Sequence, residues 1–99
     1  MTEKIRRSSG NVYRDLGYSP EEAAHLQIRG ELMIQLERTI REQKLTQVKA
    51  AKLLGVTQPR VSDLMRGRID LFSIDSLVDM LATLGMSVKV TTRRTPRVA

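Results

Sequence analysis

The chain has 99 residues, no cysteine, one histidine and a formal net charge of +6. This length fits one domain, and the lack of cysteine excludes disulfides, thiolate metal sites and cysteine nucleophiles. No apolar run approaches the roughly 18 residues of a membrane span, and the first residues lack the apolar core of a signal peptide. We therefore expect a cytoplasmic protein that binds no membrane, metal or cofactor.

The chain divides by composition into a domain and two short ends. Residues 1–10 show no hydrophobic period and are predicted to form a flexible basic arm, and residues 93–99 a flexible basic tail. Residues 11–92 are expected to form the domain itself. Its first part, residues 11–18, should be a short ordered segment that packs on the body.

The first long helix begins at a clear N-terminal signal. Ser19 is a cap residue, Pro20 occupies the first helical position, and Glu22 stands where a capping box needs it. The helix should end near Gln43, and Gly30 in its middle marks either a close packing contact or a bend. Four apolar residues recur at three- and four-residue steps, with Leu32 alongside them, and together they should form one buried stripe. They are Leu26, Leu32, Met33, Leu36 and Ile40.

Residues 46–67 read TQVKAAKLLGVTQPRVSDLMRG and predict two short helices joined by a tight turn. Thr46 and Thr57 are expected to cap the two helices, and Gly55 to supply the left-handed residue between them. Such a pair of helices is typical of a helix-turn-helix, which needs a small residue at the crossing and apolar residues in the second helix. The helices should cover 47 to about 54 and 58 to about 66. The small and apolar positions are Ala51, Val61 and Leu64.

Two more elements are expected after the second short helix. Ser73 should cap a helix that Gly85 ends, with an apolar stripe along one side. From residue 86 the period changes to strict alternation, which predicts a short strand over 86–92. One strand needs a partner, and the simplest source is the same strand of a second subunit, which would make a homodimer. A tail that alternates by chance, or pairing with residues 11–13, are the alternatives. The expected dimer contacts are Met86, Val88 and Val90.

Positive charge is concentrated on the helix-turn-helix. Residues 43–70 carry six basic and two acidic side chains, a net charge of +4 out of the total of +6. Such a patch is typical of a surface that contacts phosphates. Double-stranded DNA is therefore the expected partner. Residues suited to the DNA backbone are Gln47, Lys44, Lys49, Ser62, Arg66 and Arg68.

In a helix-turn-helix, the exposed N-terminal residues of the second helix contact base edges. If Val61 and Leu64 are buried, Gln58 can contact adenine, Arg60 guanine and Asp63 a cytosine amino group. Asp63 can instead pair with an arginine on its own helix. The candidates for base reading are Gln58, Arg60, Asp63 and Thr57.

At these residues the chain resembles the Xre/Cro-type helix-turn-helix proteins, and more narrowly the HigA-type antitoxins. The resemblance covers roughly residues 11–90 and includes GNVYRDLGYS, the run from LTQVKAAKLLG to MLATLG, with TQPRVSDL inside it, and SVKV. It implies a compact all-α, lambda-repressor-like bundle with a short C-terminal strand. It also implies a dimer that represses its own promoter at a palindromic operator, and a RelE-like toxin as partner. Pro59 departs from the wider family, in which many members have a polar base reader there.

Other functions are weaker but distinct. An enzyme is not expected, since the chain has one histidine and no phosphate loop or framed pair of carboxylates. The chain could be an interaction module that neutralises a partner with little specific DNA binding, or an Xre-type regulator without a toxin. A general nucleic-acid-binding protein that uses charge alone is a further alternative.

Overall fold

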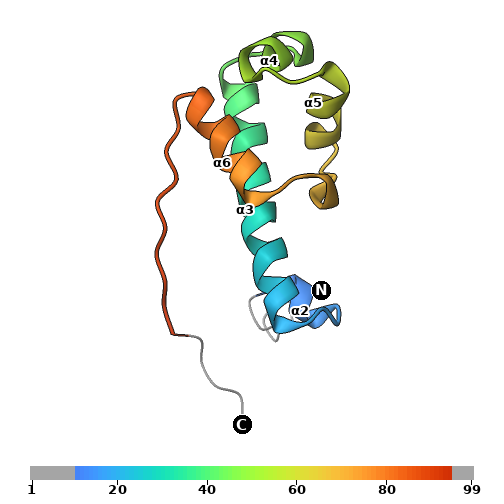
Figure 1. Cartoon of the computed structure of the whole chain (residues 1–99), viewed down its shortest axis with the longest axis vertical. Coiled ribbons are helices and arrows are strands. Elements are labelled where there is room, and N and C mark those ends of the chain that lie inside the picture. The colour runs from blue at the N-terminus through green and yellow to red at the C-terminus, as the bar shows by residue number, and fades with distance from the viewer. Residues whose placement is uncertain (1–10, 95–99) are drawn as a thin grey trace.

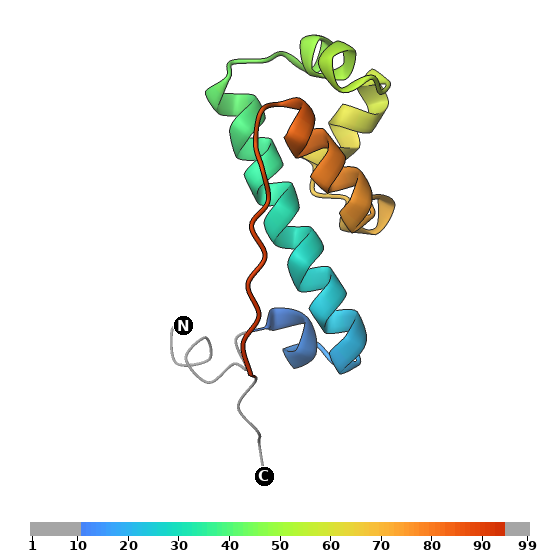
Figure 2. The same cartoon turned by 60° about the vertical axis from the view of Figure 1, so that its left-hand side comes forward.

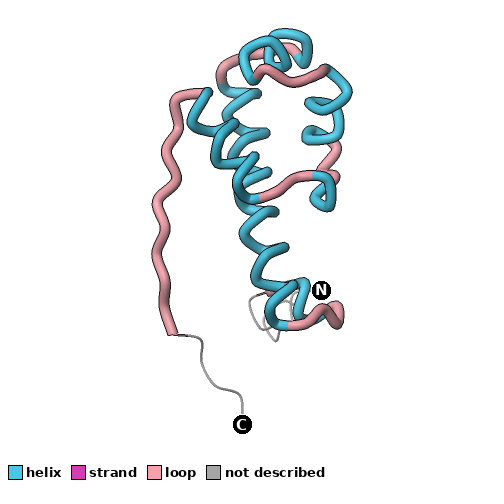
Figure 3. Tube along the Cα trace, viewed as in Figure 1, coloured by secondary structure: helices cyan, strands magenta, loops and turns pink. Residues whose placement is uncertain are grey.

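A computed structural model describes residues 11–94, and within this range the chain contains only helices and loops (Figures 1 and 3). The bundle is the all-α helix-turn-helix fold that the sequence predicts. The arm over 1–10 and residues 95–99 of the predicted tail lie outside the described residues. The elements are α2 (Val12–Asp15), α3 (Pro20–Glu42), α4 (Gln47–Leu54), α5 (Gln58–Met65), the 3-10 helix η1 (Ile69–Leu71) and α6 (Ile74–Thr83).

The long helix α3 is the axis of the molecule. It packs against α6 and α2, and it also contacts η1 and α5 (Figure 2). The Ser19 hydroxyl accepts a hydrogen bond from the Glu22 N–H at 3.1 Å, as predicted for the cap. The reciprocal capping-box bond forms instead at α6, where the Ser73 N–H donates to the Ser76 hydroxyl at 3.2 Å. Local capping thus fixes where both helices of the central pair begin.

Helix α2 packs against the first half of α3 and explains the glycine in that helix. The Asn11 side-chain amide donates to the Ala23 carbonyl at 3.0 Å, which ties α2 to α3. A Cβ on Gly30 would lie 3.4 Å from the Tyr13 hydroxyl and 3.6 Å from the Ile69 side chain. Gly30 therefore marks a close packing contact, one of the two predicted possibilities.

The core lies between α3, α6 and the two short helices. Leu36 on α3 and Leu77 on α6 are fully buried, and these two helices form the most extensive contact between elements of the fold. Four residues of the predicted α3 stripe are buried, whereas Leu26 is half-buried. The Gln43 amide donates to the Leu84 carbonyl at 3.0 Å and joins the ends of α3 and α6. The core cluster comprises Leu32, Met33, Leu36, Ile40, Ala50, Ala51, Val61, Leu64, Phe72, Leu77, Met80, Leu81 and Leu84.

The end of α3 places a lysine in a conformation that usually requires glycine. Lys44 has a φ of 57°, and among the described residues it is the one non-glycine with a positive φ. Its N–H donates to the Arg41 carbonyl at 3.0 Å, and the Leu45 N–H donates to the Ile40 carbonyl at 3.1 Å. The same pair of bonds ends α4, where Gly55 has a φ of 69°. Because a side chain in this region costs roughly 1–2 kcal/mol, the end of α3 is strained by its lysine.

Replacing Lys44 by glycine should therefore stabilise the protein. We expect Lys44→Gly to raise the free energy of unfolding by about 0.5–1 kcal/mol, measured by urea denaturation. The control Lys49→Gly removes the same charge from an exposed position inside α4. It should lower the free energy of unfolding by about 1 kcal/mol, because glycine is a poor helix former. A loss of stability in both variants would contradict this account of Lys44.

The predicted C-terminal strand is wrong. Residues 86–94 form an extended loop, of which residues 86–91 line grooves with α3 and α6, and no strand is formed within the described range (Figures 1 and 3). The alternative of pairing with residues 11–13 also fails, because Val12 and Tyr13 belong to α2. A strand needs backbone partners in a neighbouring extended segment, and every element beside this loop is a helix whose own backbone groups are already bonded.

Candidate nucleic-acid interface

Helices α4 and α5 form the helix-turn-helix with the caps that the sequence predicts. The Thr46 hydroxyl accepts from the Lys49 N–H at 3.1 Å, and the Thr57 hydroxyl accepts from the Arg60 N–H at 3.3 Å. Gly55 stands between them in the left-handed conformation. The small and apolar positions expected at the helix crossing, Ala51, Val61 and Leu64, are buried.

The exposed face of α5 begins at its N-terminus. Gln58 and Pro59 are exposed, whereas Ser62 and Asp63 are half-buried on the next turn. Within residues 11–94, the Gln58 side chain forms no hydrogen bond and Asp63 forms no ion pair with an arginine of its helix. Both side chains therefore keep their hydrogen-bonding groups for another molecule. Gln47 is the first residue of α4. It is half-buried, and its side chain forms no hydrogen bond with Gln58.

Arg60 lies differently from the other predicted base readers. Its guanidinium turns away from the start of α5, and one Nη donates to the Leu71 carbonyl at 2.8 Å. The guanidinium carbon also lies 4.1 Å from the centroid of the Phe72 ring, in cation–π geometry. In this structure the guanidinium is bound within the fold.

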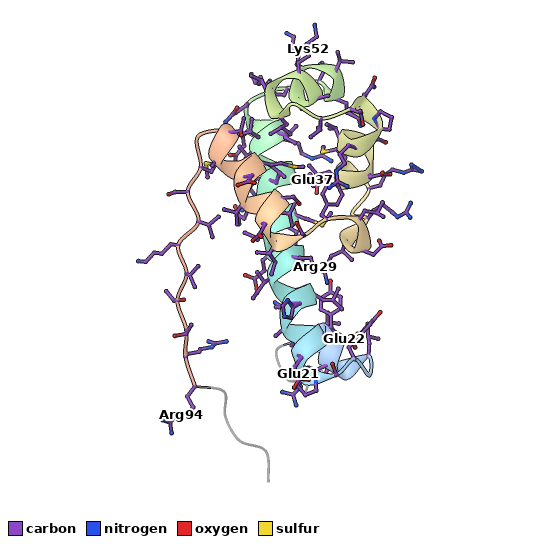
Figure 4. The ribbon with its side chains drawn as sticks, viewed as in Figure 1. Glu21, Glu22, Arg29, Glu37, Lys52 and Arg94 are labelled. Carbon is purple, nitrogen blue, oxygen red and sulfur yellow. The ribbon has the colours of Figure 1, made fainter. Side chains whose placement is uncertain are left out.

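A second arginine, on a different helix, binds the same segment. Arg29 on α3 donates from one Nη to the carbonyls of Ile69 at 3.2 Å and Phe72 at 3.4 Å. Figure 4 shows Arg29 on α3, level with the connection between η1 and α6. The sequence did not single out Arg29 or η1, because their contact joins residues far apart in the chain and has no local signal.

Four of the six predicted phosphate contacts are exposed cations on and around the motif, whereas Gln47 and Ser62 are half-buried and uncharged. Lys44, Lys49, Arg66 and Arg68 are all exposed. In the part of the chain that the structure describes, none of them forms an ion pair; the pair that is formed joins Arg41 to Glu37 on α3 at 2.8 Å. Lys52, one of the six basic residues of 43–70, is also exposed and projects outward from α4 in Figure 4. The surface can therefore offer several unneutralised charges to a polyanion.

The predicted dimer contacts lie along the C-terminal loop. Met86, Val88 and Val90 are exposed by 43%, 37% and 78%. Two grooves of about 350 and 290 Å³ run between this loop and the helices α3 and α6. Ile34, 55% exposed, lines the first groove and adds to an apolar strip on this side of the molecule.

Two further features of the described residues concern metal ligands and membrane-spanning helices. Residues 11–94 contain no cluster of three potential metal ligands, and His25 is exposed. None of the helices in that range is both long and apolar enough to cross a bilayer.

Two short capped helices joined at a left-handed glycine, with exposed cations that form no ion pair, are typical of a helix-turn-helix DNA-binding domain. The comparisons agree with this class. A family model described as "Helix-turn-helix domain" matches residues 12–93. A solved structure named "Putative XRE Family Transcriptional Regulator" is 32% identical to the chain, with a TM-score of 0.69. The match covers 79% of this chain and 88% of that one. A comparison with curated proteins found no match.

The chain belongs to the helix-turn-helix family and is of the Xre type. It is a DNA-binding transcriptional regulator.

Proposed function

We propose that this regulator is a dimeric, non-enzymatic repressor that binds a palindromic operator, its own promoter among the targets. The observation that carries the proposal is the exposed start of α5, where the Gln58 side chain has no partner within residues 11–94, on a motif whose exposed cations form no ion pair in the same range. Gln58 would read an adenine edge, with Thr57 and Asp63 beside it. Lys44, Gln47, Lys49, Ser62, Arg66 and Arg68 would hold the DNA backbone.

The dimer is proposed through apolar side-chain contacts. Met86, Val88 and Val90 would meet the same residues or the neighbouring α3 surface of a second copy, without pairing of backbone strands. The arrangement matches the proposed operator, because a two-fold dimer of such domains would read two half-sites of a palindrome. Exposed apolar side chains beside two grooves give the contact a surface that gains from burial.

A toxin partner is proposed on the resemblance to HigA-type antitoxins. In addition, α2 and the turn after it expose Val12, Leu16 and Tyr18 by 55%, 69% and 47%, which provides apolar surface for a protein. A RelE-like reading frame beside this gene, whose toxicity is relieved by co-expression of this chain, would support the antitoxin role. If no such reading frame lies beside the gene, the protein would be a stand-alone Xre-type regulator without a toxin.

The test is a titration of the full chain on a duplex from its own upstream region and on a scrambled duplex. We expect a preference of at least about a hundredfold for the upstream palindrome, with two chains bound per duplex. Gln58→Ala should reduce this preference by about tenfold while leaving salt-dependent binding to the scrambled duplex unchanged.

The matched control is Gln27→Ala, which removes the same side chain from a position on α3 remote from α5 and should leave the preference intact. Equal affinity of the wild-type chain for both duplexes would refute the proposal. One chain per palindrome would refute its dimeric part.

A further inference from the structure

Arg60 joins the exposed start of α5 to the segment that precedes α6. Arg60 lies in the first turn of α5, two residues after Gln58, yet its guanidinium is bound to the Leu71 carbonyl at 2.8 Å and stacked on the Phe72 ring. The exposed start of α5 and the buried ring are therefore connected through one side chain. Phe72 itself is 2% exposed and cannot reach another molecule.

We propose that Arg60 is a positioning residue for DNA recognition, which holds α5 at the angle where Gln58 meets the base edges. The inference rests on the proposed function, since it assumes that α5 reads DNA. This role differs from direct base reading by Arg60. The guanidinium would contact only protein groups, and neighbouring residues of α5 would contact the bases.

Both kinds of contact are needed to fix an orientation. A hydrogen bond to the Leu71 carbonyl fixes one point, and stacking on the ring fixes the plane of the guanidinium. Together they restrain rotation of α5 about its own axis. Val61 and Leu64 hold α5 only on its buried side, so this restraint adds to theirs. A lysine could donate to the carbonyl, but its ammonium has no planar face to stack.

The segment over 69–72 transmits this restraint to the rest of the fold. Arg29 on α3 donates to the carbonyls of Ile69 and Phe72, and Arg60 on α5 donates to that of Leu71. Two arginines from different helices thus bind carbonyl groups of one short segment. Through this segment, the orientation of α5 is fixed relative to the long helix α3.

The experiment compares Arg60→Ala, Arg60→Lys and Phe72→Leu in the full chain. Binding is measured to the preferred duplex, to duplexes changed at each base pair in turn, and over a range of salt. We expect Arg60→Ala to lower the preference by about tenfold, with the loss spread over the base pairs that α5 reads. The slope of log affinity against log salt should not change. Phe72→Leu should reproduce this pattern although Phe72 cannot touch DNA, and Arg60→Lys should restore part of the preference.

The control is Arg66→Ala, which removes an exposed arginine from the end of α5. It should reduce the salt slope by about 0.9, the value for one lost phosphate contact, and leave the preference unchanged. Arg60→Ala would overturn the proposal if its loss were confined to one base pair, since that indicates base reading. A reduced salt slope would indicate a phosphate contact and would overturn it as well, as would an unchanged preference.

A measurement without DNA separates this inference from the proposed function. Amide hydrogen exchange of α5 should be faster by about tenfold in Arg60→Ala and in Phe72→Leu, because opening of a local element controls exchange. In Arg60→Ala, whose side chain is not part of the core cluster, exchange in α6 should stay as in the wild-type chain. If the wild-type chain shows no sequence preference but α5 exchange responds in this way, the proposed function fails and the restraint on α5 stands. Unchanged α5 exchange in both variants would overturn the restraint itself.

Discussion

Replacing Leu36 by alanine should lower the free energy of unfolding by about 2–5 kcal/mol. Leu36 is 0% exposed in the second half of α3, where it contributes to the core shared with α6. The substitution removes buried methyl groups and leaves a cavity that the close-packed helices can fill only in part. For a domain with a total stability of about 5–15 kcal/mol, this is a large share. Urea denaturation followed by circular dichroism measures the change.

Leu53→Ala is the matched control, because it makes the same substitution in a helix at a side chain that is 53% exposed. It should change the free energy of unfolding by no more than about 0.5 kcal/mol. Equal losses in the two variants would show that burial of Leu36 is not what makes it stabilising.

Replacing Ala51 by leucine should damage both stability and DNA recognition. Ala51 is 7% exposed at the crossing of α4 and α5, so a larger side chain must push the two helices apart. Overpacking of this kind typically costs about 1–3 kcal/mol. Because α5 is displaced relative to α4, the variant should also lose its preference for the operator while it remains able to bind DNA through charge.

The control for this variant is the next residue of the same helix. Lys52 is exposed and points outward from α4, so Lys52→Leu introduces the same side chain without contact at the crossing (Figure 4). Its thermal midpoint should stay close to that of the wild-type chain, and its preference for the operator should be retained. An Ala51→Leu variant that keeps both properties would mean that the crossing has room to spare.

Much of the fold could be predicted because its signals are local. Caps at Ser19, Thr46 and Thr57 and the turn at Gly55 each depend on hydrogen bonds between residues three or four positions apart. The apolar stripe of α3 follows from a period of about 3.6 residues, which sequence alone displays. These features defined the helix-turn-helix before any tertiary contact was known.

The C-terminal segment was misassigned for a physical reason. Alternation of Met86, Val88 and Val90 is compatible with a strand, but it equally fits an extended loop with one side toward the α3 and α6 grooves. Whether such a segment becomes a strand depends on backbone partners elsewhere, and its own residues cannot reveal them.

Part of the candidate interface was also beyond sequence reasoning. A guanidinium has the same donors for a guanine edge and for a backbone carbonyl, so the identity of Arg60 left its partner open. The contact with Leu71 spans 11 residues and that between Arg29 and Ile69 spans 40. Gln58, in contrast, lies exposed on α5 as the burial of Val61 and Leu64 requires, although its contact with DNA stays a prediction.

The short connections between successive helices have a kinetic consequence. From α2 to α6, each helix follows its predecessor after only a few residues, and α3 contacts most of the others. Chains whose contacts are mostly local close few large loops, and helical domains of this kind fold in about microseconds to milliseconds. We therefore expect rapid single-exponential refolding, with the DNA-facing surface complete as soon as the core has formed. A newly made chain would then be folded, and able to meet a second copy, within a small fraction of the time needed to synthesise it.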